Sequence, residues 1–368
     1  MNQKFIRKRV EEYIKAEGQY VSTQKLLDSG AVPRLQGYIV RPGKVSNSIF
    51  GGKGSYVDKA SGESVEFENP PLLDKNGIPL RLMVRTDRIS THDINRGSIP
   101  FKDQILAENH YLMRKLLRSA VGTSQYDVGL SSNAVVIAAE DLKQISIEMV
   151  LRAYAAESTT STSLYQAYFV RGERRFCGHP LPEGLIPNGR LPYVMDTPST
   201  KSELHDESIA PAVLFERGIC TPDNYQQIRN GALVAFGIAS HFLLQKGILL
   251  IDTKTEHGVN TKGQIVSQDE LYTFDSSRFW KWKEYKEQLG KLCEGRIEKL
   301  NPTSYSKEFA RGFSIGEQGY SDEERIKIAI RYYQSIQLLN KNLCEFDMRP
   351  REQRVVSGLQ TIVDQLVA

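Results

Sequence analysis

The segment LLIDTKTEHG, residues 249–258, runs from an apolar stretch into alternating polar residues, which is typical of a buried strand with charge at its end. Successive side chains of a strand point to opposite faces, so Asp252, Lys254 and Glu256 are expected in a row on one face. Burying charge without a partner is costly, so this row needs partners or ligands. The segment therefore predicts a charged functional site on one face of a sheet.

A second acidic segment follows this strand after the turn VNTKGQ, residues 259–264. It places Asp269 on what we expect to be the next strand, so that a hairpin brings Glu256 and Asp269 together. Proteins usually bind Mg²⁺ through one or two carboxylates together with nucleotide phosphates, and Lys254 would lie beside such a phosphate. The alternative is a surface hairpin with paired charges, which the apolar residues 249–251 disfavour.

The composition is that of an ordinary globular protein. The chain of 368 residues is 40% hydrophobic and 25% charged, long enough for one large or two ordinary domains. Its formal net charge of +4 does not indicate a nucleic-acid or membrane partner, although it is compatible with small anionic substrates. The four cysteines form no CxxC pair and no apolar run reaches about 18 residues, so we expect a soluble cytoplasmic protein. The sequence leaves open whether the chain forms a homo-oligomer.

The chain divides into four zones by residue pattern. Residues 1–36 carry amphipathic helical patterns and are expected to form a peripheral extension. Residues 37–98 contain short β-like runs separated by Gly, Ser, Asn and Pro, which predicts a small antiparallel lobe. Residues 99–282 mix helices and strands, and residues 283–368 are mostly charged helix with a capping box at 321–324. This mixture indicates an α+β fold.

Two polar segments of the expected β lobe have compositions suited to anions. RPGKVSNSIFGGKGSYV, residues 41–57, lets backbone N–H groups and Lys44 or Lys53 approach phosphates. It is not the GxxxxGK[ST] loop, so a flexible hairpin is the alternative. RTDRISTHD, residues 85–93, concentrates charge at a strand end, and a salt-bridged turn is the alternative there.

Two further segments combine hydroxyl groups with cations. SIEMVLRAYAAESTTSTSLY places Glu148 and Arg152 on one side of a strand, followed by six Ser or Thr residues at 158–163. An arginine beside hydroxyls suits a phosphomonoester, because the guanidinium binds two oxygens in its plane, whereas a solvated polar loop is the alternative. DTPSTKSELHDESI, residues 196–209, would hold a charged amino acid or form a capped surface turn.

The order of these segments resembles one enzyme family. GKV, TDRIS, EMVLRAY, PLPEGL, TPSTK, DTK.E.G and DELYTFDSSRFW occur in an order similar to phosphoribosylaminoimidazole-succinocarboxamide synthase, or SAICAR synthetase, over residues 37–282. The resemblance implies a small β lobe and a larger mixed α/β lobe with an ATP cleft between them, and helical extensions at both ends that it does not explain. It implies an ATP- and Mg²⁺-dependent ligase of purine (IMP) biosynthesis, which joins L-aspartate to the carboxylate of carboxyaminoimidazole ribonucleotide (CAIR), giving SAICAR, ADP and phosphate.

The resemblance and the charges together assign roles to individual residues. The predicted metal ligands are Glu256 and Asp269. The predicted ATP-binding residues are Gly43, Lys44, Val45, Lys254 and Glu256. The predicted substrate-binding residues are Asp87, Arg88, Ser90, Arg152, Ser158, Ser199, Thr200, Lys201, Asp275 and Arg278. Within that set the CAIR phosphate is assigned to Arg152, Ser158 and Arg278, and L-aspartate or the carboxylates to Lys201. The predicted catalytic residues are Lys254, Asp275 and Lys201.

The chain also departs from the family's usual residues, at His92, Glu157, Thr255, His257 and Phe274. The two histidines either pack in aromatic positions or titrate near neutral pH beside phosphates. Two other functions therefore remain open, another ATP- and Mg²⁺-dependent small-molecule kinase or ligase and a non-catalytic nucleotide-binding homologue. An assay with and without aspartate separates the first, and the retained charged residues argue against the second.

Overall fold

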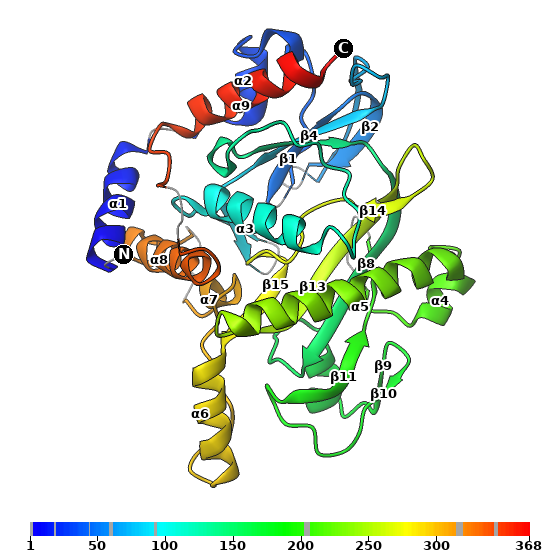
Figure 1. The fold of residues 1–368 in the computed structure, drawn as a ribbon, viewed down its shortest axis with the longest axis vertical. Helices are drawn as coiled ribbons and strands as arrows, with labels where there is room; N and C mark the ends of the chain where they lie inside the picture. Colours follow the sequence, from blue (N-terminus) through cyan, green and yellow to red (C-terminus); the bar gives the residue numbers. More distant parts are fainter. Residues whose placement is uncertain are drawn as a thin grey trace.

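The structure, a computed structural model, describes residues 3–17, 20–43, 45–58, 62–91, 94–201, 207–313, 319–341 and 345–368. Within these residues the chain forms a small lobe around a three-stranded sheet and a larger lobe around a six-stranded sheet (Figure 1). Helices lie between and beside the sheets and at both ends of the chain. This arrangement confirms the predicted α+β fold.

The sheet of the small lobe is antiparallel, in the order β1-β4-β7. Its strands are β1 (Ser46–Phe50), β4 (Leu80–Arg85) and β7 (Val136–Glu140). The same part of the chain forms two hairpins, β2 (Gly52–Val57) with β3 (Ser64–Asn69) and β5 (Arg88–Thr91) with β6 (Ile94–Ser98). The sequence predicts the end of the small lobe at residue 98. β7 follows that residue but pairs with β4, so the expected boundary would divide this sheet.

Both ends of the chain contribute to the core of the small lobe. The elements concerned are α2 (Thr23–Asp28), η1 (Pro33–Leu35) and α9 (Arg351–Leu366). Figure 1 shows α9, in red, beside α2, in blue. Leu27 of α2 and Leu359 of α9 are fully buried in one cluster with Leu82 of the sheet. The expectation of a peripheral N-terminal extension is therefore wrong for α2, because its apolar face completes a core.

The larger sheet is also antiparallel, with β8 and β13 at its centre. Its strands are β8 (Lys143–Tyr154), β11 (Arg190–Asp196), β12 (Ser199–Thr200), β13 (Ile248–Val259), β14 (Ile265–Ser267) and β15 (Ser277–Lys281). The predicted hairpin is present, since β13 and β14 pair from His257 with Ser267 to Val259 with Ile265. Asp269, however, lies just beyond β14 rather than within a strand, because the pairing ends at Ser267.

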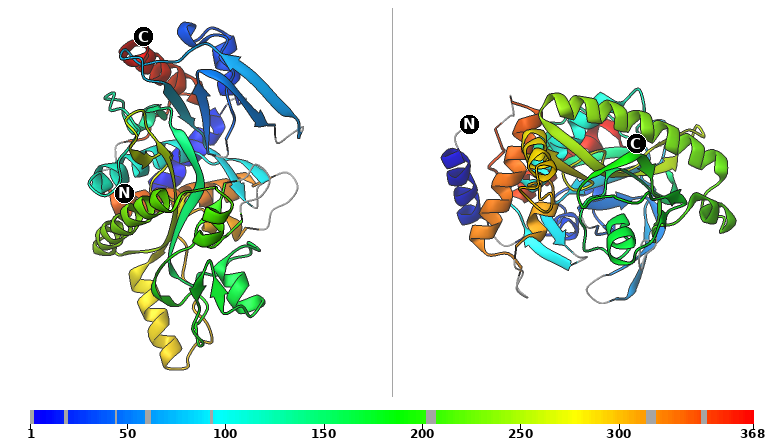
Figure 2. Two further views of the ribbon diagram at one scale, coloured as in Figure 1. Left: turned by 90° about the vertical axis from the view of Figure 1, so that its right-hand side faces the viewer. Right: turned by 90° about the horizontal axis from the view of Figure 1, so that it is seen from below.

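Two predicted helices, α3 (Lys102–Leu117) and α5 (Pro222–Gln245), are confirmed. α5 packs against β13 and β8 along one side of the larger sheet (Figure 2). Apolar residues of β8, including Ile147 and Leu151, share a buried cluster with Ala235 of α5. Since side chains alternate along a strand, the opposite face of β8 presents Glu148 and Arg152.

The remaining elements of the larger lobe are short. They are η3 (Gln166–Val170), α4 (Pro211–Glu216), and the strands β9 (Arg175–Phe176) and β10 (His179–Pro180), which pair. Leu164, Phe176 and Leu191 form part of a separate small core beneath them. This core anchors the segments that follow β8. The short η2 (Ser132–Ala134) precedes β7 and lies against α3 and α9.

The C-terminal helices extend the body of the larger lobe. They are α6 (Trp282–Cys293), α7 (Glu308–Arg311) and α8 (Asp322–Leu339), and α1 (Gln3–Ala16) packs on α8. The predicted capping box opens α8, with Ser321 Oγ accepting from the N–H of Glu324 at 3.4 Å. α1 is not peripheral either, since Ile6, Val10 and Tyr13 are buried in the main core.

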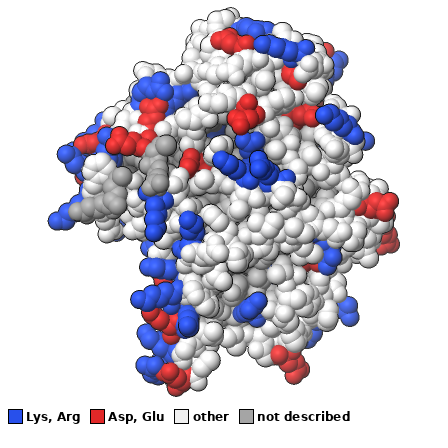
Figure 3. Space-filling model, in the orientation of Figure 1, with Lys and Arg blue, Asp and Glu red and all other residues white. Residues whose placement is uncertain are grey.

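α6 projects away from the body in Figures 1 and 2, and Figure 3 shows basic and acidic side chains mixed along it. Of the helices in the described ranges, none combines the length and the apolarity needed to span a membrane.

Candidate active site

The predicted row of charges lies on the central strands of the larger sheet. The pairing of β13 with β8 sets Asp252 opposite Arg152 and Glu256 opposite Glu148. On the other side of β13, Arg278 of β15 is opposite Asp252. Directly opposite residues of antiparallel strands have side chains on the same face. The sheet therefore brings together charges that are about a hundred residues apart in the chain.

At one end of the row, two arginines share one carboxylate. Arg152 Nη1 lies 2.9 Å from Asp252 Oδ2, and Arg278 Nε lies 2.9 Å from Asp252 Oδ1. Burial opposes ionisation of this carboxyl, but Arg278 and Arg152 nevertheless lower the pKa of Asp252. Two cations against one anion leave an excess positive charge at a mostly buried place. Such a place suits an anion with oxygens to share, such as a phosphate.

The segment after β8 meets these arginines. Arg278 Nη1 donates to the carbonyl oxygen of Glu157 at 3.1 Å, next to Ser158, and Arg152 Nε donates to Thr197 Oγ1 at 3.0 Å. The three residues predicted to bind the CAIR phosphate thus lie together. Thr197 belongs to the DTPST segment, which the structure brings to the same place.

Lys254, in the middle of the row, pairs with Glu148. Its Nζ lies 2.8 Å from Glu148 Oε1, and the side chain is about half exposed. The loss of hydration at this position disfavours the ammonium, but the carboxylates of Glu148 and Glu256 outweigh it and raise the pKa of Lys254. The ammonium therefore stays charged and keeps an exposed side for a ligand.

At the other end of the row, several charges act on Glu256 and on Asp269. Burial raises the pKa of Glu256, and the like charge of Asp269 adds to this effect, while Lys201 Nζ contacts Glu256 Oε2 and opposes it. Burial also opposes ionisation of Asp269, yet Arg81 and Arg85 lower the pKa of Asp269. The N–H of Gln268, next to Asp269, donates to the carbonyl oxygen of Glu256 at 3.0 Å, so the chain returns to Glu256 just before Asp269.

This donor set fits Mg²⁺ bound together with a nucleotide. Among the described residues no group of three or more His, Cys, Asp and Glu side chains could by itself hold a metal ion. Mg²⁺, however, commonly uses one or two carboxylates and takes its other ligands from waters and phosphates. Two partly buried carboxylates that repel each other would gain from a divalent cation between them. The metal assignment itself remains a prediction.

The segment 268–276 carries Asp269 and is held by buried groups. His110 of α3 is 2% exposed, and burial lowers its pKa to about 3. Its neutral ring accepts the N–H of Leu271 at Nδ1, 3.0 Å away. Arg85, which is 1% exposed, lies 3.7 Å from Glu270 Oε2. These contacts to buried side chains hold the segment in place beside the site.

In the small lobe, the predicted ATP segment is shaped by close backbone approach. A Cβ at Gly43 would lie 2.3 Å from the carbonyl oxygen of Ser46, so only glycine fits there. Val45 accepts the N–H of Thr86 at 2.8 Å. Arg88 Nη2 donates to the carbonyl of Gly43 at 2.6 Å, which supports this segment. Lys44 lies outside the described residues.

Asp87 and Ser90, predicted to contact substrate, belong to the small lobe. Asp87 is 3% exposed, and burial followed by the nearby charge of Asp103 raises its pKa to about 6. Ser90 is half-buried on β5. The structure does not place either residue in the charged row of β13.

The TPSTK segment reaches the row through β12. Ser199 pairs with Glu148 across the strands, and its Oγ donates to Glu148 Oε2 at 3.4 Å. Thr200 Oγ1 accepts the N–H of Glu207 at 3.0 Å. Lys201 follows at the end of β12 and contacts Glu256, so the segment adds a cation to the acidic end of the row.

Asp275 is placed differently from its predicted contact with substrate. Its side chain is 1% exposed and lies 2.8 Å from Nζ of Lys102, whose side chain is fully buried. Tyr332 of α8 donates to Asp275 Oδ1 at 2.5 Å. The carboxylate thus has protein partners in the interior and does not line the row, because the chain turns it inward ahead of β15.

His257 packs as a buried neutral ring. It is 3% exposed, and burial lowers its pKa to about 4. This favours the packing interpretation over a charge beside phosphates. His92 lies outside the described residues.

Several supporting residues were missed by sequence reasoning. Lys102, Asn109 and His110 were not singled out, because a helical stretch with polar residues at these positions looks like an ordinary amphipathic helix. Their burial depends on α3 lying between other elements. The one feature of the sequence that could have indicated these buried polar residues is the polar run KDQ at the start of the predicted helix, which precedes its apolar residues.

A comparison with known families agrees with this site. The sequence model described as SAICAR synthetase matches residues 75–324. The chain belongs to the SAICAR synthetase family. This confirms the resemblance inferred from TPSTK, DTK.E.G and DSSRFW.

Curated relatives carry the name of this family. The chain is 32% identical over 278 residues to the phosphoribosylaminoimidazole-succinocarboxamide synthase of Legionella pneumophila (strain Paris), an alignment that covers 73% of this chain and 85% of that protein. It is 34% identical to the chloroplastic enzyme of Arabidopsis thaliana over 66% of this chain, but this spans only 56% of the plant protein.

Solved structures share the fold at lower identity. A structure titled SAICAR synthase superposes with a TM-score of 0.62 at 22% identity and covers 84% of this chain and 96% of that chain. The Saccharomyces cerevisiae SAICAR synthase in complex with SAICAR has a TM-score of 0.59 at 21% identity, again covering 84% of this chain and 96% of that chain. A type-2 SAICAR synthetase in complex with ADP has a TM-score of 0.55 at 22% identity and covers 84% of this chain and the whole of that chain. These structures support the fold assignment.

Proposed function

We propose that this protein catalyses the ATP-dependent ligation of L-aspartate to the carboxylate of CAIR, giving SAICAR, ADP and phosphate. One observation carries the proposal: one sheet face holds the cationic centre of Arg152 and Arg278 at one end and Glu256 at the other, where the like charge of Asp269, just beyond β14, acts on Glu256. The first suits a ribose phosphate and the second a metal-bound nucleotide. The reaction named for the relatives, and a relative's complex with SAICAR, support this choice.

The chemistry follows from the weakness of a carboxylate as an electrophile. A carboxylate oxygen of CAIR attacks the γ-phosphorus of ATP, the bond to ADP breaks, and an acyl phosphate forms. The aspartate amine then attacks the acyl carbon, the phosphate leaves with the bonding electrons, and the nitrogen loses a proton. Such a reaction needs positioned reactants and neutralised charge rather than a protein nucleophile.

The residues of the row have separate tasks in this scheme. Arg152, Arg278 and Ser158 bind the CAIR phosphate and hold the carboxylate towards the centre of the row. Lys254 contacts the transferring phosphate, because it lies between the two ends of the row on β13 and its side chain is about half exposed. Lys201, on the TPSTK segment, binds a carboxylate of L-aspartate. Ser199 and Thr200 support that contact.

Glu256 and Asp269 would hold Mg²⁺, which neutralises phosphate charge when it is bound. Gly43, Lys44 and Val45 cover the nucleotide, and Arg88 supports that segment through Gly43. The ADP complex of a relative supports nucleotide use. A cytoplasmic location, predicted from the cysteines, is part of this proposal, and plant relatives are named as chloroplastic.

Omission of each reactant in turn tests the proposal. Release of phosphate and ADP is measured with CAIR, L-aspartate, ATP and Mg²⁺ together, and then with one of them absent. We expect phosphate release to require all of them and one SAICAR to form per ADP. Phosphoryl transfer that does not depend on aspartate would indicate a kinase, and nucleotide binding without turnover would indicate a non-catalytic homologue.

A further inference from the structure

The segment 268–276 is attached to the charged row at both of its ends. The N–H of Gln268 donates to the carbonyl of Glu256 at 3.0 Å, and the N–H of Lys254 donates to the carbonyl of Ser276 at 3.0 Å. Asp269 lies at the start of the segment, and Arg278 follows its end. The placement of this segment therefore decides where a metal ligand and a phosphate ligand lie relative to β13.

α3 presents an unusual polar face to this segment. Its residues Lys102, Asn109 and His110 are all between 0% and 2% exposed. Buried polar groups are costly unless they are bonded, so these side chains must have defined partners. Asn109 Oδ1 accepts the N–H of Phe274 at 2.9 Å, and Lys102 Nζ lies 2.8 Å from Asp275 Oδ2. With His110 on Leu271, α3 therefore holds the segment at three points.

A second helix holds the same carboxylate from the other side. Tyr332 of α8 donates to Asp275 Oδ1 at 2.5 Å, while the ammonium of Lys102 on α3 forms an ion pair with Oδ2 at 2.8 Å, so two different helices hold the carboxylate. Lys102 also donates to the carbonyl of Arg88 at 3.0 Å, which joins the group to the segment carrying β5. Burial opposes ionisation, but Lys102 and Lys307 lower the pKa of Asp275, so the carboxylate is charged.

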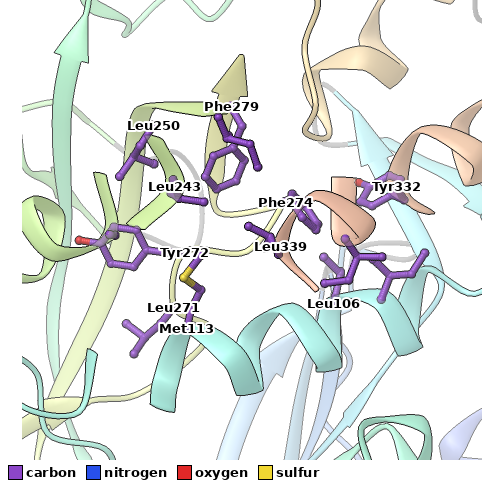
Figure 4. Packing of buried hydrophobic residues seen from close by; sticks show 14 of the residues in the cluster. Leu106, Met113, Leu243, Leu250, Leu271, Tyr272, Phe274, Phe279, Tyr332 and Leu339 are labelled. Atoms are coloured by element: carbon purple, nitrogen blue, oxygen red, sulfur yellow. The ribbon is translucent and has the colours of Figure 1, made fainter. Parts of the chain in front are cut away.

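The apolar side chains of the segment are embedded beside these groups. Figure 4 shows Leu271, Tyr272 and Phe274 in the cluster above α3, with Tyr332 on the neighbouring helix. Tyr272 has φ 51°, a left-handed conformation that is costly for a residue with a side chain. Such a conformation persists only where the surroundings determine it, as the polar and apolar contacts do here.

We propose that Lys102, Asp275 and Tyr332 form a clamp of positioning residues, which sets the placement of Asp269 and Arg278 for the ligation. The inference rests on the proposed function. It gives the C-terminal helix α8 a task in the reaction, and it replaces the predicted substrate contact of Asp275. The competing interpretation is a purely structural cluster, whose loss lowers stability and leaves metal and substrate binding unchanged in the folded protein.

Tyr332→Phe is the mildest test, because it removes one hydroxyl and keeps the ring in the core. The readout is the gain in ADP affinity on adding Mg²⁺, measured by calorimetry on the full chain. We expect this gain to fall roughly 10-fold or more, as when a group that orients a metal ligand is removed, while ADP affinity without metal stays the same. The KM for CAIR should rise in the same variant, because Arg278 follows the segment.

Ser335→Ala is the matched control. Ser335 is equally buried on α8, and its Oγ lies 2.9 Å from the carbonyl oxygens of Tyr305 and Arg331, neither of which belongs to the segment. A similar loss of thermal stability with wild-type metal dependence is expected in this variant. Equal effects of Tyr332→Phe and Ser335→Ala on metal dependence would overturn the clamp.

The double variant Lys102→Met/Asp275→Leu separates charge from packing. Replacing a buried ion pair by apolar residues of similar volume is often neutral for stability. We expect a folded protein, judged by circular dichroism, with the same loss of metal-dependent ADP affinity as Tyr332→Phe. Wild-type values in both variants would refute the inference. Absence of ligase activity in the wild-type chain would instead count against the proposed function, because the calorimetric readout does not need turnover.

Discussion

The shared carboxylate of Asp252 leads to a prediction that sequence alone does not suggest. Arg278→Ala removes one of two guanidiniums from a mostly buried group, so the net charge of Asp252, Arg152 and Arg278 falls from one positive charge to none. We expect the KM for CAIR to rise strongly. Adding Asp252→Asn to this variant should recover part of the loss, because Arg152 then has no anion to neutralise it.

The magnitude follows from the charges. A unit charge about 6 Å from a phosphate, at an effective dielectric constant of about 20, contributes roughly 3 kcal/mol. That corresponds to an increase of about 100-fold in KM for Arg278→Ala. In the double variant the excess positive charge returns but one charge-assisted hydrogen bond is missing, which leaves a deficit of about 10-fold.

The assay is steady-state phosphate release with CAIR varied at saturating ATP, Mg²⁺ and L-aspartate, in the wild type, both single variants and the double variant. Thermal melting shows whether each variant is folded. The KM for ATP should stay near the wild-type value in all four proteins. If the double variant has a KM for CAIR as high as that of Arg278→Ala, the charge argument is refuted. A raised KM for ATP with an unchanged KM for CAIR would indicate that Arg278 binds the nucleotide instead.

Three further predictions concern the metal ligands, the N-terminus and a buried histidine. Glu256→Gln and Asp269→Asn should each reduce turnover strongly with the fold intact, because each removes a ligand charge at almost constant volume; normal rates at low Mg²⁺ in both would exclude the metal assignment. Deletion of residues 1–28 should now destabilise the protein, since α1 and α2 bury apolar residues in both cores, and an unchanged melting temperature would contradict this. His257 has a folded pKa of about 4 against an ordinary 6.5, so the unfolded chain binds more protons between these values and stability falls as pH falls from 6.5 to 4. His257→Phe should flatten that part of the stability profile in urea unfolding at pH 7 and pH 5, and an unaltered slope would show that His257 is not its source.

The local sequence pattern determined the charged strand and the hairpin that follows it. The alternation of LLIDTKTEHG placed Asp252, Lys254 and Glu256 on one face of a strand, and the turn at 259–264 brought Asp269 back towards Glu256. These features depend on neighbours in sequence, through the period of a strand and the length of a turn. The family resemblance rests on the same segments, which is why the sequence already indicated the proposed function.

Only the tertiary structure decided which charges neutralise one another. Asp252 lies between Arg152 and Arg278 because two strands distant in the chain flank β13, and no local period encodes that register. Asp275 turns to Lys102 and Tyr332 because burial makes a charged group take the nearest opposite charge, and those partners come from separate helices. α2 and α9 complete one core for a similar reason, since an apolar helix face is satisfied by whichever surface the fold brings to it.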